Sequence, residues 1–435
     1  MYTRKQMREK MDRLEMEVAF AALRGNDLVP NDYDLPRIEE AAKQIYDLSH
    51  GRNEVRFDRL GRPNIMVNIP NGDEARLGYL SAGGTIFSDS DWGSGDSATY
   101  KRNVHPAFVV NGEVVNGLRI GKYPAVRHNG KNYLVSLPGL DPACGTGGFN
   151  CSYNGIIGEC DRVNAGTARD DGDYMHSLST AEFGFLGVLA ARKGFECRGN
   201  DARGASNRVS SEHGAPAKYL YQGLFVNTKT GSGPDSWRHD GSCFGIADLR
   251  GNVGVLTLGY QTLGGRLLYI PDNDVAGFAA SLQMQEKLSE TSDAYKALKT
   301  DGTWLDQTTA EASMMYDYTV DPGESGSKGF CIATSLLHQQ TNDNVYGSQA
   351  LADLRARDSV TIPLYMRLLL DAPLLSGTPQ GTHYMNNNVN VRRVAFRGGY
   401  WSNGSGAGFS SAYGSGWGFG FTFGSYGGAR PASYW

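Results

Sequence analysis

The chain has 435 residues, among them 57 glycines and six cysteines, and its formal net charge is −4. This length predicts two or three domains, and so small a charge excludes a strong electrostatic attraction to nucleic acid. No segment reaches the run of about 18 apolar residues that spans a bilayer, so we expect no membrane insertion.

Residues 1–52 are expected to form a helical segment for association or docking. The first stretch, "MYTRKQMREKMDRLEMEV", is charged throughout and lacks the apolar core of a signal peptide, so we expect synthesis in the cytoplasm without an export signal. Apolar residues recur at alternating steps of four and three, which predicts a helix with one apolar seam: Met7, Met11, Leu14, Val18 and Ala21. A second helix is predicted between Asp34, its cap, and Gly51. The first helix either packs on a neighbouring domain or associates with another copy.

Residues 53–135 are predicted to be rich in β-strands. The segment "EVRFDRLGRPNIMVNIP" has the pattern of two strands joined by a Gly-Arg-Pro turn. Two more hairpins are predicted around Asn111-Gly112 and Asn129-Gly130, because Asn-Gly favours two-residue turns with positive φ.

Residues 136–435 are predicted to form one large domain that mixes helices and strands. The clearest helix covers 177–193, where Ser179 and Glu182 form a capping box and Gly194 ends the helix. A second helical run is predicted over about 274–298, followed by a polar loop or insertion over 299–327. Residues 348–373 are expected to return to helix and continue as an apolar run. The predicted class of the whole chain is α+β.

We expect no metal site and no cofactor. Cys144, Cys151 and Cys160 lie close together, but their spacing is not that of a zinc site, and buried thiols or a disulfide are the favoured interpretations. The acidic segment "ARDDGDYMHS" could hold a structural calcium ion, yet it lacks the glycine and terminal glutamate of a calcium loop, so a solvated turn is favoured. His239 precedes Cys243 by four residues and is interpreted as a turn histidine.

From Arg397 onward the chain combines glycine, serine and aromatic residues with almost no charge. Over 416–424 glycines and aromatic residues alternate, which predicts a strand with one aromatic face: Trp417, Phe419, Phe421 and Phe423. That face is either part of the core or partly exposed as a contact surface. Aromatic residues mixed with serine and glycine are typical of adaptable binding surfaces. The high aromatic content disfavours a flexible linker.

Two segments carry a resemblance to a known family. The first is "GIADLRGNV" at 245–253, and the second opens with "RGGYW" at 397–401 and closes with "GARP" at 428–431. Both resemble proteins with the formylglycine-generating-enzyme fold, a glycine-rich elaboration of the C-type lectin fold. They resemble in particular the variable proteins of diversity-generating retroelements, in which a reverse transcriptase rewrites adenine-containing codons of the lectin domain. The resemblance covers about 55–435 and implies a scaffold role for Gly251, Asn252, Arg397, Gly398, Gly399, Trp401, Arg430 and Pro431.

The resemblance implies a C-type lectin-like domain over 136–435, with a variable ligand-binding region at about 397–432. The implied contact residues are Tyr400, Ser402, Asn403, Ser405, Ser411, Tyr413, Ser415, Trp417, Phe419, Phe421, Phe423, Ser425 and Tyr426. Phage members of the group are receptor-binding proteins at the tail tip. The implied location is therefore the virion, and the implied partners are other tail proteins and a bacterial surface protein or glycan. The implied assembly is a homo-oligomer, with a trimer favoured.

Two departures from the family bear on function. The enzymes need cysteines in the C-terminal segment, and this chain has none after Cys331. The family's W-E-W after G-N-V is here Gly254-Val255-Leu256, which removes a carboxylate that could hold calcium. Both departures favour a binding protein over an enzyme. The alternatives are an oxidase of the formylglycine-generating type and a structural virion component in which the aromatic strand is buried.

Overall fold

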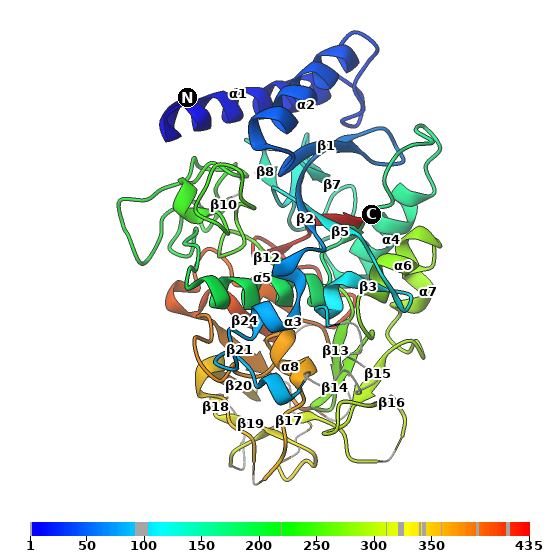
Figure 1. Ribbon diagram of the computed structural model, residues 1–435, viewed down its shortest axis with the longest axis vertical. Helices are drawn as coiled ribbons and strands as arrows, with labels where there is room; N and C mark the ends of the chain where they lie inside the picture. Colours follow the sequence, from blue (N-terminus) through cyan, green and yellow to red (C-terminus); the bar gives the residue numbers. More distant parts are fainter. Residues whose placement is uncertain are drawn as a thin grey trace.

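The computed structural model describes residues 2–91, 103–218, 220–309, 311–320, 326–338, 341, 345–357, 359–388, 391–414 and 418–435. It combines helices with mainly antiparallel sheets, as expected for the α+β class. Figure 1 shows the N-terminal helix pair at one end of the molecule, a long helix across the middle, and several small sheets below it.

The N-terminal segment forms the two predicted helices, α1 (Arg4–Leu23) and α2 (Leu35–Ser49). The predicted seam of α1 is buried against α2 and the sheet below, with Met11, Leu14 and Val18 in one apolar cluster. Asp34 stands at the N-cap of α2, but its side chain makes no capping hydrogen bond and pairs with Arg24 at 3.3 Å instead. Helix α1 therefore packs on the rest of its own chain, which is the first of the two interpretations given for it.

The β-rich segment contributes to a sheet that the last strand of the chain completes. Its order is β1 (Asn53–Phe57), β2 (Pro63–Pro70), β5 (Gly117–Gly121), β26 (Pro431–Tyr434) and β9 (His176–Ser177). Because β26 pairs with β5, the segment 53–135 and the C-terminus share one hydrogen-bonded layer. This pairing fixes the position of the residues just before β26.

Both predicted Asn-Gly hairpins are present. Strands β3 (Val109–Val110) and β4 (Glu113–Val114) flank the first turn, and β6 (Ala125–His128) and β7 (Lys131–Ser136) flank the second. Positive φ angles at both Asn residues and both glycines match the expected turn type. Strand β8 (Asp141–Pro142) adds to the second hairpin.

The predicted helix at 177–193 is α5 (Thr180–Lys193), with the capping box of Ser179 and Glu182 and the left-handed Gly194 at its end. Helix α4 (Tyr153–Asn164) was not predicted, although Ser152 caps it with its side chain. The prediction of one long helix over 274–298 is wrong. The chain forms only α6 (Asp274–Ala280) and α7 (Met284–Lys287) before β15 (Lys296–Leu298), because Leu282, with a φ of 58°, lies in the left-handed region between them.

The polar section 299–327 contains strands where a loop was expected. Strand β16 (Trp304–Asp306) extends the sheet β15, β14 (Arg266–Tyr269), β13 (Tyr260–Leu263) and β22 (Arg392–Arg393), and β17 (Met315–Tyr318) pairs with β14 and β19 (Phe330–Ala333). These strands were not predicted because they are short, and an alternation of apolar and polar residues is a weak signal over so few residues.

A mixed sheet carries the C-terminal segment. Its strands, in order, are β18 (Gly326–Lys328), β20 (Val345–Ala350), β21 (Thr382–Met385), β24 (Gly408–Gly414), β23 (Phe396–Gly398), β12 (Gly254–Leu256) and β25 (Gly427–Gly428). Within 348–373 the predicted helix is reduced to α8 (Leu364–Leu368) and a short 3-10 turn, Leu351–Asp353. Figure 1 shows β24, β21, β20 and β18 side by side below α5.

The remaining short elements complete the fold. They are α3 (Leu77–Leu80), β10 (Leu220–Tyr221), β11 (Leu224–Phe225) and the 3-10 turns Asp73–Ala75, Asp89–Asp91, Pro106–Phe108, Asp235–Trp237 and Gly404–Gly406. Within the described ranges no helix has the length and apolar character needed to cross a bilayer.

Candidate ligand-binding surface

Tyr413, one of the predicted contact residues, lies between two aromatic rings supplied by neighbouring strands. In the register of the sheet, Tyr413 on β24 is paired with Tyr384 on β21 and with Phe396 on β23. The ring of Tyr413 stacks on Tyr384 at 3.9 Å and on Phe396 at 4.9 Å between centroids. This stacking holds the Tyr413 side chain in one orientation while part of it remains exposed.

A row of five tyrosines extends from this stack, and we call it the tyrosine surface: Tyr346, Tyr384, Tyr413, Tyr400 and Tyr426. Each ring lies next to another of the row, with centroid distances of 6.4, 3.9, 5.6 and 5.0 Å in that order. Tyr346 is 37% exposed and the other four are partly exposed. Tyrosines in such a row offer large apolar faces with a hydroxyl at the tip, which suits contact with a protein or a sugar.

Asn403 links the tyrosine surface to the polar loop beside it. Its side-chain amide donates to the Tyr413 hydroxyl at 2.7 Å, and its side-chain oxygen accepts from the Tyr400 backbone N–H at 2.7 Å. Burial raises the pKa of Tyr413 well above its ordinary value, so its hydroxyl stays protonated at neutral pH. Ser402 and Ser405 on the same loop are exposed, so they add hydroxyl groups at the edge of the tyrosines.

The backbone beneath this loop is held by residues of the "GIADLRGNV" segment. The Trp401 N–H donates to the Asn252 carbonyl at 3.2 Å, and the Gly251 N–H donates to the Gly398 carbonyl at 3.0 Å. Gly398 has a φ of 85°, and a Cβ there would lie 2.4 Å from the Leu249 carbonyl oxygen. A side chain at Gly398 would therefore force the two segments apart.

Two buried ion pairs fix the same region from below. Arg397 binds Asp371 through its guanidinium and donates to the Leu370 carbonyl at 3.2 Å. Arg250 pairs with Asp201 at 2.8 Å and also donates to a carbonyl of the loop, that of Gly404, at 3.3 Å. Since all four charged side chains are almost fully buried, each pair depends on the geometry of its partner.

Arg430 and Pro431 anchor the end of the segment. Arg430 is fully buried and donates to the carbonyls of Gly121, Ala247 and Asp248 at 2.7–3.0 Å. Burial lowers the pKa of Arg430 to about 10, which still leaves it charged at neutral pH. Pro431 begins β26, so the arginine connects the candidate surface to the first sheet.

Four of the predicted contact residues lie in the interior instead of on the surface. Ser411 is fully buried on β24, and Ser425 accepts a hydrogen bond from the buried Trp401 indole at 3.2 Å. Phe419 packs edge-on against Tyr153 at 4.7 Å, and Phe423 packs against Phe396 at 5.3 Å. These side chains support the surface from within, so a ligand would not contact them. Ser415 and Trp417 lie outside the described residues.

The strand predicted over 416–424 does not form across its described part, 418–424. Phe421 donates its N–H to the Gly418 carbonyl in a turn, and Phe423 exchanges backbone hydrogen bonds of 2.9 Å with Cys151 and Gly145. The aromatic residues of the expected face therefore lie in different environments. Phe421 is 43% exposed, whereas Phe419 and Phe423 are buried. The 418–421 turn, closed by the Phe421 N–H, interrupts the extended backbone that the alternation of side chains predicted.

Sequence reasoning missed Tyr346 and Tyr384. Both lie in segments with no resemblance motif and reach the surface only through sheet pairing, with β20 beside β21 and β21 beside β24. The one local signal is the alternation around Tyr384, where His383 and Met385 are buried and Tyr384 is partly exposed.

The cysteines and the acidic segment have ordinary structural environments. All six thiols are free and buried, and burial raises the pKa of Cys144 and of Cys197 to about 12. His239 accepts the Ile246 N–H at 2.8 Å, as a turn histidine does. Asp173 pairs with Arg56 at 2.6 Å. Within the described residues, no group of three or more His, Cys, Asp or Glu side chains is arranged to hold a metal ion.

Comparison with protein-family models finds no match, and comparison with curated proteins finds no significant match either. The residues and contacts of the chain itself must therefore carry the functional argument.

Proposed function

We propose that the protein is a ligand-binding protein, without enzymatic activity, that recognises bacterial surface proteins or glycans through the tyrosine surface and the loop at 402–405. In this proposal it has the C-type lectin fold of retroelement-diversified variable proteins and acts at a phage tail tip as an oligomer, with a trimer favoured. Its other partners there would be tail proteins, and no cofactor would be required.

One observation carries the proposal. The side chains of Ser402 and Ser405 are exposed, and those of Tyr400, Asn403 and Tyr413 are partly exposed. They stand on a backbone that buried groups beneath it hold in place. Such a surface can exchange small and aromatic side chains with limited effect on folding, because buried ion pairs and hydrogen bonds hold the backbone beneath it. It also offers aromatic faces at low entropic cost, and its lack of charge avoids desolvation of unmatched charges by a ligand.

The exposure of Tyr400 and Tyr413 favours this function over a purely structural virion component with a buried aromatic segment. An oxidase of the formylglycine-generating type would need an ionisable thiol near the surface. In this chain burial raises the pKa values of the Cys144 and Cys197 thiols instead. That alternative is tested by an oxidase assay on a sulfatase peptide that contains the target cysteine. Robust turnover of the peptide would favour the oxidase over our proposal.

The genetic part of the proposal is tested by sequencing the DNA around the gene. We expect a near-identical copy of the region that encodes 397–432, with differences confined to adenines of the copy, next to a reverse transcriptase gene. Flanking DNA without either element would remove the retroelement and leave only a binding protein.

The binding part is tested with variants and labelled bacteria. A Tyr400→Ala, Tyr426→Ala double variant is expected to lose at least tenfold in binding to a panel of bacterial cells while it remains folded, with a melting temperature lowered by only a few degrees because the two rings pack on Trp401. The matched control is Tyr33→Ala, Tyr46→Ala, which removes two exposed tyrosines of the N-terminal segment. Equal binding by both double variants to a cell type that the native protein binds would contradict the assigned surface.

A further inference from the structure

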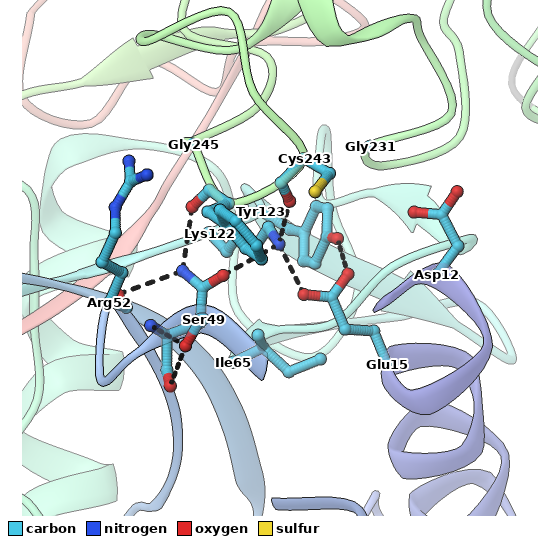
Figure 2. Close-up of polar contacts among 12 residues, drawn as sticks. Asp12, Glu15, Ser49, Arg52, Ile65, Lys122, Tyr123, Gly231, Cys243 and Gly245 are labelled. Atoms are coloured by element: carbon cyan, nitrogen blue, oxygen red, sulfur yellow. Dashed lines mark hydrogen bonds and ion pairs between the residues drawn. The ribbon is translucent and has the colours of Figure 1, made fainter. Parts of the chain in front are cut away.

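A lysine, an asparagine and a glutamate meet in the interior where the N-terminal helices join the first sheet. Lys122 follows β5, Asn53 begins β1, and Glu15 lies on α1. All three side chains are fully buried. Figure 2 shows the Lys122 amine at the centre of this group, with Glu15 and Tyr123 to its right and the backbone of Cys243 above it.

The distances bring reactive atoms together. The Lys122 amine lies 2.6 Å from a Glu15 carboxylate oxygen and 3.3 Å from the side-chain oxygen of Asn53. The second Glu15 oxygen accepts the Tyr123 hydroxyl at 2.6 Å, which fixes the carboxylate. The Asn53 amide nitrogen donates to the Phe244 carbonyl at 2.9 Å, which holds the amide carbon next to the amine. The amine, the amide and a proton acceptor are thus all within hydrogen-bond range.

From this arrangement we propose that Lys122 and Asn53 form an intramolecular isopeptide bond, with Glu15 as the base. The Glu15 carboxylate takes a proton from the Lys122 ammonium group, and the free amine attacks the side-chain carbonyl carbon of Asn53. The new bond joins the lysine nitrogen to that carbon, and the bond from the carbon to the amide nitrogen breaks. That nitrogen leaves with the two protons released by the lysine nitrogen, one of them passed on by Glu15, as an ammonium ion. The Glu15 carboxylate is regenerated, and no oxidant or reductant is needed.

The surroundings favour the neutral reactants. Burial lowers the pKa of Lys122, and the Glu15 carboxylate opposes this shift only in part. A buried ion pair is costly to desolvate, so passing the proton to Glu15 to give an amine and a carboxylic acid relieves that cost. The reactants are also held by folded elements from three parts of the chain, which raises their effective concentration greatly.

The bond would join the start of β1 to the end of β5 and enclose β2 between them. Like a disulfide, it would restrict the unfolded chain, but reducing agents would not break it. Such a covalent link would cross-link two strands of the first sheet beneath the N-terminal helices.

Peptide mapping of the native full-length protein tests the proposal directly. After denaturation, trypsin would release 53–56, 120–122 and 123–127 as separate fragments from an unlinked chain. The linked chain would instead give 53–56 joined to 120–127, because trypsin does not cut after a modified lysine. The joined fragment would be lighter than its parts combined by one ammonia, after allowance for the uncut peptide bond. Ammonia loss at an Asn-Gly site such as Asn111-Gly112 cannot produce a joined fragment.

Variants test the role of Glu15 as the base separately from the existence of the Lys122–Asn53 bond. Glu15→Gln is expected to abolish the joined fragment, as are Lys122→Arg and Asn53→Ala, and Lys131→Arg at an exposed lysine is expected to retain it. If these buried substitutions prevent folding, the map of the native chain still decides the matter. If the folded native protein still yields only linear fragments after prolonged incubation at neutral pH, the proposal is overturned. A joined fragment in folded Glu15→Gln would overturn the role of Glu15.

Discussion

At the scale of single residues, His105 shows how burial sets a protonation state. Its side chain accepts the Ala107 N–H at 3.2 Å through one ring nitrogen, and its other ring nitrogen lies 3.1 Å from the Leu368 carbonyl. Only the neutral ring satisfies both contacts, because one nitrogen must accept while the other donates. Burial lowers the pKa of His105 to about 3, and the hydrogen bond to Leu368 counters this shift only in part.

This protonation state predicts a loss of stability in mild acid. Below about pH 6.5 the unfolded chain binds a proton at His105 that the folded chain does not bind, so the free energy of unfolding falls as the pH falls toward 3. His105 alone should contribute a loss of about 2 kcal/mol between pH 7 and pH 5. Urea unfolding at both pH values measures it.

The matched variant is His105→Asn, whose side chain can still cap the turn but does not titrate. Its free energy of unfolding should fall by about 2 kcal/mol less than that of the native protein over the same pH range. Parallel pH dependences for the two proteins would show that His105 is not kept neutral by the fold.

At the scale of elements, α5 approaches the end of α8 and the residues just after it through two glycines. A Cβ on Gly184 would lie 2.5 Å from the Leu368 carbonyl oxygen, and one on Gly187 would lie 2.2 Å from a methyl group of Leu370. Glycine in a helix costs roughly 1 kcal/mol relative to alanine, so these positions give up helix propensity for close packing. Gly187 also lies against Phe409 on β24, and α5 thereby supports the sheet that carries the tyrosine surface.

Two glycine-to-alanine substitutions separate the effect of close helix packing from that of helix propensity. Gly184→Ala should destabilise the protein by about 1 to 3 kcal/mol, because the new methyl group meets backbone atoms. Gly158→Ala on α4 should stabilise it by up to about 1 kcal/mol, since a Cβ there meets only the end of the Gln285 side chain at 3.6 Å. Denaturant midpoints measure both changes, and equal shifts of the same sign would contradict the packing argument.

These elements also show what could be predicted from the sequence. Helix α5 was predicted with its capping box and its final glycine because both signals are local. The backbone path through Phe419 and Phe423 was not, since it is fixed by hydrogen bonds to Asn154, Cys151 and Gly145, far away in the sequence. For the same reason the exposed loop residues near Tyr400 could be anticipated from a motif, whereas Tyr384 became visible only when β21 was placed beside β24.

At the scale of the whole molecule, the N-terminal helices are integrated with the fold. The apolar side chains of α1 share a cluster with Ile65, Val126 and Val135 of the sheets beneath. Arg8 adds an ion pair of 2.6 Å with Asp235 and a hydrogen bond of 3.0 Å to the Gly233 carbonyl. Figure 1 places this helix pair at the end of the molecule away from β24, so it supports the fold without taking part in the tyrosine surface.

Deletion of residues 1–52 is therefore expected to destabilise the remaining chain. It exposes the apolar cluster to water and removes Glu15, whose carboxylate accepts a hydrogen bond from the buried Lys122 amine at 2.6 Å. We expect a lower melting temperature and increased binding of a dye that reports exposed apolar surface. The control is Lys5→Ala, Glu9→Ala, which removes an exposed ion pair of the same helix and should change stability by less than about 0.5 kcal/mol. A deleted chain that melts like the native protein and binds no dye would show that the sheets do not need this segment for their stability.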